Sequence, residues 1–241
     1  MGWRAIRPGS QEEQVGRLVL AGVLVVTLPS VPILGYAIYP FIILTTWFHE
    51  MGHGMAALAT GNEFTQLVIM PNGSGVATSA TAMDTLGISR ALIAMGGPLG
   101  PSIVGALLIL ASSNHRLWKP VLLALAAALV VSTLVWVRSL TGWIVLPLVA
   151  LLLVAVTWRG RDWLQLFSLQ FLGVLAALSM FRDWDYLFSE VAVVGGQAML
   201  SDTGAMEAEL WLPHWVWAIV IIALSGLMIG ASLKYALNRE G

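Results

Sequence analysis

Apolar segments, each long enough to cross a lipid bilayer, follow one another along this chain of 241 residues. A run of about 18 or more apolar residues predicts a membrane-spanning helix, because a helix satisfies its backbone hydrogen bonds without water. Six segments are predicted to span, and a seventh, shorter segment at 18–28 ends beside two prolines. The six predicted spans are 33–60, 86–111, 118–137, 140–157, 163–181 and 212–236.

Charged residues are too few for a soluble protein. They make up 10% of the chain and apolar residues make up 58%, against about 25% and about 45–50% in soluble domains. The absence of Cys excludes a disulfide-stabilised secreted module, and a net charge of −1 argues against a nucleic-acid partner. We therefore expect one domain over residues 1–241, an all-α polytopic membrane protein with six to seven transmembrane helices and a short membrane-associated hairpin.

A cluster of ionisable residues lies within the apolar segment 33–60. His49, Glu50 and His53 form a His-Glu-x-x-His pattern, and in a helix the two histidines lie on one face, one turn apart. This spacing suits two imidazole ligands of one Zn²⁺ ion, with the glutamate placed to act as general base on metal-bound water. Because ionisable side chains are costly inside a bilayer, the cluster favours a metal site over a structural role.

A catalytic zinc ion usually has three protein ligands, so another segment must supply the third. Four predicted crossings after residue 60 return the chain at residue 182 to the side of the membrane nearest the motif, and leave His115 on the other side. The segment 182–211 holds six of the thirteen acidic residues. Asp183, which directly follows a predicted span, is the predicted third ligand, and Asp185 and Asp202 are the alternatives.

Two glycine-containing motifs predict departures from regular helix. Asn72-Gly73 is a strong turn signal, and a short exposed hairpin there could hold an unwound substrate by strand addition. Gly96-Gly97-Pro98 and Gly100-Pro101 lie inside the predicted span 86–111. They are expected to kink or interrupt this helix, and a water path to the zinc ion is one hypothesis for their role.

The sequence Phe-His-Glu-Met-Gly-His-Gly at 48–54 resembles the active-site helix of site-2-protease-type intramembrane zinc metallopeptidases. The closer similarity is to their small B-like branch, which lacks PDZ and CBS domains. The hairpin segment 71–78, the Gly-Pro segment 96–101 and Ser201-Asp202 before the last apolar segment are similar as well, so the likeness spans about residues 15–235.

The resemblance implies regulated cleavage of transmembrane proteins within the bilayer. It implies that His49 and His53 bind Zn²⁺ and that Glu50 is catalytic. The better-known members supply the third ligand from a Leu-Asp-Gly or Asn-Pro-Asp-Gly motif, and this chain contains neither. The departure leaves the third ligand to be found among the acids after residue 182.

Three functions are weighed for this multi-pass protein, which we expect in the bacterial inner (cytoplasmic) membrane. The first is a zinc endopeptidase that cleaves a transmembrane substrate by metal-activated water. The second, prompted by the missing third-ligand motif, is a non-proteolytic scaffold subunit whose partner is a membrane complex. The third is a transporter with a proton or metal relay, and the absence of internal repeats argues against it.

Overall fold

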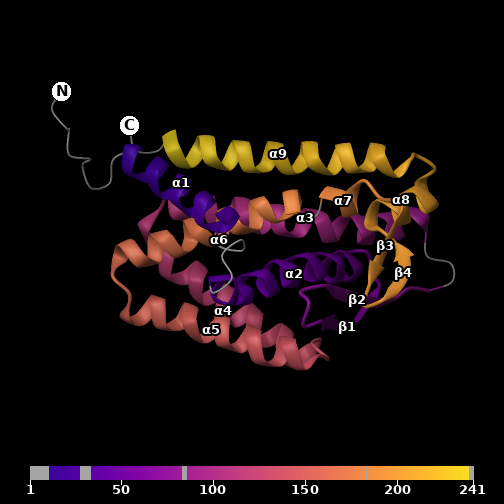
Figure 1. Ribbon diagram of the computed structural model, residues 1–241, viewed down its shortest axis with the longest axis horizontal. Helices are drawn as coiled ribbons and strands as arrows, with labels where there is room; N and C mark the ends of the chain where they lie inside the picture. The colour runs from indigo at the N-terminus through magenta and orange to yellow at the C-terminus, as the bar shows by residue number, and fades with distance from the viewer. Residues whose placement is uncertain (1–10, 28–33, 83–85, 183, 239–241) are drawn as a thin grey trace.

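The computed structural model describes residues 11–27, 34–82, 86–182 and 184–238, which form long helices with two small hairpins at one end (Figure 1). The helices are α1 (Gln11–Thr27), α2 (Leu34–Ala59), α3 (Gly87–Ser112), α4 (His115–Val135), α5 (Leu140–Arg159), α6 (Asp162–Arg182), α7 (Trp184–Leu187), α8 (Asp202–Leu210) and α9 (His214–Asn238). The strands are β1 (Glu63–Ile69), β2 (Gly75–Ala80), β3 (Val191–Val194) and β4 (Gln197–Leu200).

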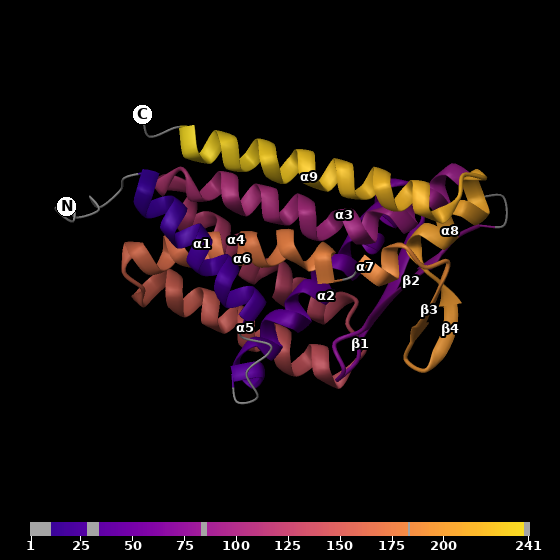
Figure 2. The same cartoon turned by 45° about the horizontal axis from the view of Figure 1, so that its top comes forward.

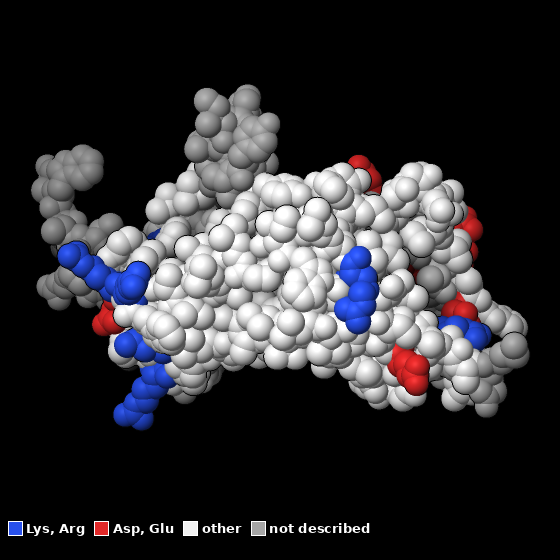
Figure 3. Space-filling model, turned by 90° about the horizontal axis from the view of Figure 1, so that it is seen from below, with Lys and Arg blue, Asp and Glu red and all other residues white. Residues whose placement is uncertain are grey.

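The all-α polytopic architecture predicted from the apolar segments is confirmed. Within the described residues, α3, α4, α5, α6 and α9 are long and apolar enough to cross a membrane, and α1 is apolar but shorter. The 26-residue helix α2, which contains His49, Glu50 and His53, coincides with the predicted span 33–60 but is not among these five helices. On the face shown in Figure 3, most charged side chains lie toward the two ends, and the surface between them is largely uncharged.

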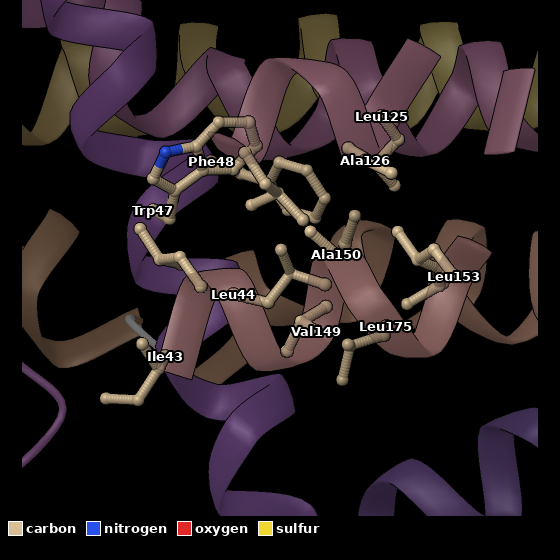
Figure 4. Close-up of a cluster of buried hydrophobic side chains, with 14 of the residues drawn as sticks. Ile43, Leu44, Trp47, Phe48, Leu125, Ala126, Val149, Ala150, Leu153 and Leu175 are labelled. Carbon is tan, nitrogen blue, oxygen red and sulfur yellow. The ribbon is translucent and has the colours of Figure 1, made fainter. Parts of the chain in front are cut away.

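The main hydrophobic core fixes the rotation of α2. Residues three and four positions apart share a helix face, so Leu44, Trp47 and Phe48 project together into the bundle. They pack among side chains of α4, α5 and α6, such as Ala126 and Val149 (Figure 4). The indole N–H of Trp47 donates to the hydroxyl of Ser132, 2.9 Å away. This packing turns the His-Glu-x-x-His residues of α2 away from the core and toward the hairpins.

Helices α2 and α3 approach each other closely because glycines face each other at the crossing. A Cβ atom on Gly52 would overlap the carbonyl oxygen of Gly96, and one on Gly100 would lie 2.6 Å from that of Phe48. Small residues permit such close contact between membrane helices. The expected interruption at 96–101 is wrong, since α3 continues through Pro98 and Pro101. Proline is tolerated in such membrane helices because neighbouring helices can satisfy the backbone groups that it leaves unpaired. The glycines of this segment allow α3 to pack closely against α2.

The predicted hairpin is confirmed. Strands β1 and β2 pair antiparallel, and Gly73 in the turn has φ +89°, a conformation that favours glycine. The outer edge of β1 is occupied, because the N–H of Leu67 donates to the carbonyl of Trp136 at 2.8 Å and the N–H of Arg138 donates to the carbonyl of Leu67 at 2.9 Å. Strand β2 therefore forms the other edge of this two-stranded sheet.

A second hairpin, which the sequence interpretation missed, joins α7 to α8. Strands β3 and β4 pair antiparallel around Gly195 and Gly196, whose φ angles are +61° and +83°. Both views show this hairpin at the same end of the molecule as β1 and β2, directly beside α8 (Figures 1 and 2). The end of the bundle near the His-Glu-x-x-His motif is thus covered by two hairpins.

Candidate metal centre

Three side chains from two distant segments converge at the hairpin end of α2. His49 and His53 lie one turn apart on α2, and their Nε2 atoms are 3.2 Å apart. Asp202, the first residue of α8, places Oδ2 3.0 Å from Nε2 of His49 and Oδ1 3.2 Å from Nε2 of His53. The three residues form a group able to hold a metal ion, with ligand atoms all within 4.8 Å of one another.

The arrangement fits a zinc ion in both spacing and chemistry. Ligand atoms about 2.0–2.1 Å from one tetrahedral Zn²⁺ lie about 3.3 Å apart, close to the separations above. Oδ2 of Asp202 is buried, and no hydrogen bond among the described residues satisfies it. Nδ1–H of His53 donates to the carbonyl of Ile93 at 2.7 Å, which leaves Nε2 as the metal-binding nitrogen. Two imidazoles and a carboxylate are a known catalytic zinc ligand set.

The charge of Asp202 suits a metal ligand. Burial acts to raise the pKa of its carboxyl, but attraction to His53 and the close contacts of both imidazoles outweigh burial and lower the pKa below its ordinary value. The carboxylate form is therefore favoured at neutral pH. A carboxylate must be deprotonated to bind a metal ion, and Asp202 meets this requirement.

The start of α8 holds Asp202 in place through the residues around it. Ser201 is the N-cap, and its hydroxyl accepts from the N–H of Gly204 at 3.0 Å and donates to the carbonyl of Ser189. The hydroxyl of Thr203 donates to the carbonyl of Leu187 at 2.8 Å. These bonds anchor the start of α8 to the last residue of α7 and to the segment after it, so they restrict movement of the carboxylate away from the histidines.

Glu50 lies beside the three ligands but outside their group. It is 6% exposed, and its carboxylate accepts a hydrogen bond from the backbone N–H of Ala77 in β2. A Cβ on Gly75 would lie 2.8 Å from Oε1 of Glu50, so only glycine leaves room for this carboxylate against the strand. The geometry holds Glu50 between the metal ligands and the edge of β2.

Tyr186 of α7 contacts the third ligand. Its hydroxyl accepts a hydrogen bond from the N–H of Asp202 and donates one to the carboxylate, and its ring centre lies 6.2 Å from that of His49. Burial and the charges of Asp202 and Glu50 raise the pKa of Tyr186, so the hydroxyl keeps its proton. A group that hydrogen-bonds a metal ligand orients that ligand. No motif in the sequence pointed to this residue.

Two adjoining cavities give access to the centre. One, of about 290 Å³, is lined by the three ligands and by Glu50, and the other, of about 210 Å³, lies toward Thr45 and Thr46. His49, Glu50 and Tyr186 line both cavities. The candidate metal centre can thus be reached from two sides.

The structure places Asp202, and not Asp185, beside the two histidines. Asp202, an alternative in the sequence interpretation, joins the two histidines, whereas Asp185 is exposed and does not belong to the metal-binding group. Asp183 lies outside the described residues, so its role stays a prediction. His115 is 3.4 Å from Asp162 at the opposite end of the bundle, as the crossing count predicted.

Gly97 of α3 lies against both histidines and yields a sharp prediction. A Cβ at this position would overlap Nε2 of His53 and lie 2.8 Å from Nε2 of His49. We expect Gly97→Ala to displace both imidazoles and to weaken zinc binding by about 10–100-fold, measured by competition with a chromogenic chelator. Gly230→Ala is the matched control, since no atom lies within 4 Å of a Cβ there. Equal zinc affinity in the two variants would contradict this expectation.

The hydroxyl of Tyr186 should affect zinc affinity through Asp202. Tyr186→Phe keeps the ring and removes the hydrogen bonds to Asp202, so we expect zinc affinity to fall by about 10–100-fold. Tyr39→Phe serves as control, because it also removes a tyrosine hydrogen bond, the 2.9 Å bond to the carbonyl of Pro71, away from the metal ligands. A zinc titration of the two purified variants compares them, and an unchanged affinity for Tyr186→Phe contradicts the assigned contact.

Comparison with known proteins identifies the family of this chain. The family model described as Peptidase M50B-like matches residues 17–232, a range that contains His49, Glu50, His53 and Asp202. No curated protein and no solved structure matches the chain. The family match covers most of the sequence and confirms the resemblance seen at residues 48–54. The chain therefore belongs to the Peptidase M50B-like family of site-2-protease type.

Proposed function

We propose that this protein is an intramembrane zinc endopeptidase that cleaves transmembrane protein substrates. The convergence of His49, His53 and Asp202 beside Glu50 carries the proposal. The three ligands leave a fourth position for water or substrate, the arrangement found in catalytic rather than structural zinc sites.

The residues have separate roles in the proposed reaction. His49, His53 and Asp202 would hold the zinc ion, which when bound supplies a water of lowered pKa and polarises the scissile carbonyl. Glu50 accepts the proton of the attacking water on its carboxylate and delivers it to the nitrogen of the leaving amine. Tyr186 holds Asp202 in its binding orientation throughout, because its hydroxyl contacts both the backbone and the side chain of that residue.

The substrate is expected to bind in extended form. A peptide bond within a helix is shielded by its hydrogen bonds, so a transmembrane segment must unwind before cleavage. Strand β2 offers an edge beside Glu50, and an unwound segment could add to this edge as a further strand. The polypeptide backbone would then be held next to the metal ligands independently of its side chains.

One of the two observations that prompted the scaffold alternative was the lack of a recognisable third-ligand motif. Asp202 lies beside the two histidines and answers that observation. A buried carboxylate in contact with two histidines favours the metal-dependent function over the scaffold. We therefore do not propose the scaffold function.

Zinc removal tests the proposed function directly. The full chain, purified and reconstituted into liposomes with a pool of single-span peptides, is expected to cleave some of them with about one zinc per chain. A chelator should abolish cleavage, and Zn²⁺ but not Mg²⁺ should restore it, because imidazole ligands do not suit Mg²⁺. Cleavage that persists after the zinc has been removed, as verified by elemental analysis, would sink the proposal.

A further inference from the structure

The β3–β4 hairpin places uncharged residues beside the metal centre. Its strands contain no charged residue, and several of its apolar side chains are exposed on the surface of the chain, including Val193 at 72% and Leu200 at 46%. Val194, Met199 and Leu200 line the cavity that holds the metal ligands. Apolar side chains of the hairpin are therefore placed to contact a molecule bound in this cavity.

The hairpin is held at both its base and its tip. At the base, the N–H of Ser201 donates to the carbonyl of Glu190 at 2.9 Å, so β4 is fixed just before Asp202. At the tip, a Cβ on Gly195 would lie 2.6 Å from Cε of Met70 at the end of β1. The second hairpin therefore reaches across to the first, and its apolar side chains keep a defined position beside the cavity.

Helix α3 supplies the other apolar side of the same cavity. Ile93 and Ala94 line it, and the backbone carbonyl of Ile93 also holds the ring of His53. Arg90 is the cation among the described lining residues, and it is engaged by Glu209, with Nε–Oε1 and Nη2–Oε2 distances of 2.7 and 3.0 Å. A charged side chain entering between α3 and β4 would lose water without gaining a free partner.

We propose that Leu200 and Met199 of β4, with Ile93 and Ala94 of α3, form an apolar subsite for a substrate side chain that flanks the scissile bond. This inference rests on the proposed protease function and adds a substrate class to it, namely extended segments with an uncharged, apolar residue at that position. Strand addition at β2 would bind any sequence, so the side of the cavity formed by α3 and β4 determines which residue is accepted.

The test changes the volume of the subsite and reads the cleavage sites. Wild-type protein in liposomes is given a set of single-span peptides in which one position at a time carries a small, a large apolar or a charged residue, and mass spectrometry identifies the bonds cut. We expect charged residues to be depleted at one flanking position by tenfold or more. Leu200→Ala should shift the preference there toward larger side chains, and Ala94→Leu toward smaller ones, each by about tenfold.

Val191→Ala is the matched control, because Val191 belongs to the same hairpin, is 52% exposed and does not line either cavity beside the metal centre. Its preference should equal that of wild type. The exposed position of Leu200 keeps the test valid even if Ala94→Leu fails to fold. Cleavage with an unchanged preference in Leu200→Ala overturns the subsite alone, whereas absence of cleavage by zinc-loaded wild type overturns the protease function on which it depends.

Discussion

Replacing Asp202 with Ala is expected to remove zinc from the protein. The carboxylate contacts both histidine nitrogens at 3.0 and 3.2 Å, and its loss leaves two ligands on one helix. The loss of a direct ligand should exceed the 10–100-fold change typical of an outer contact, so we expect less than one tenth of an equivalent of zinc after dialysis. Elemental analysis of the purified variant measures this, and circular dichroism verifies that the helices remain.

The other acids of the same region make this experiment decisive. Asp185→Ala should keep one equivalent of zinc, since Asp185 is exposed and stands outside the ligand group. Asp183→Ala tests the ligand first predicted from the sequence. Zinc loss in Asp183→Ala together with zinc retention in Asp202→Ala would refute the assignment made from the structure.

Replacing Glu50 with Gln should abolish cleavage while leaving the metal bound. The amide has the size of the carboxylate but cannot accept the proton of the attacking water, and general-base catalysis contributes about 10²–10⁴-fold. Because Glu50 lies outside the ligand group, zinc content should stay at one equivalent. The cleavage rate of a peptide identified with wild-type protein measures the loss.

A second Glu→Gln change separates catalysis from general effects on the protein. Glu63 is exposed at the start of β1, and Glu63→Gln should cleave at the wild-type rate. If the zinc-loaded Glu50→Gln protein cleaves as fast as Glu63→Gln, another group must take the proton, and the role given to Glu50 is wrong.

Most of the helical fold could be predicted because the bilayer imposes a simple local rule. Each of the six predicted spans coincides with a helix, and five of these helices are long and apolar enough to cross a membrane. The same local reasoning wrongly predicted an interruption of α3 at its Gly-Pro segment. Proline predicts a local break, but the continuity of α3 depends on packing against α2 at Gly52, which a single segment does not reveal.

The His-Glu-x-x-His motif could be recognised within one segment of the sequence. The third member of the metal-binding group, Asp202, could not. His49, Glu50 and His53 owe their placement to one helical turn. Asp202 meets them only through the path of α6, α7 and the β3–β4 hairpin, so sequence reasoning narrowed the third ligand to one acidic segment. The Gly195-Gly196 pair was a readable hairpin signal, and β4 ends directly before the Ser201 cap.

The separation of the ligands along the chain determines when the metal centre can assemble during synthesis. The ribosome produces α2 early, and α3, α4, α5 and α6 must follow before α8 supplies Asp202. Until then, a nascent chain holds two histidines without their partner carboxylate. A chain truncated before residue 202 would lack the third ligand of the metal centre. Under the proposed function, newly inserted molecules therefore become able to cleave neighbouring membrane proteins only once α8 is in place.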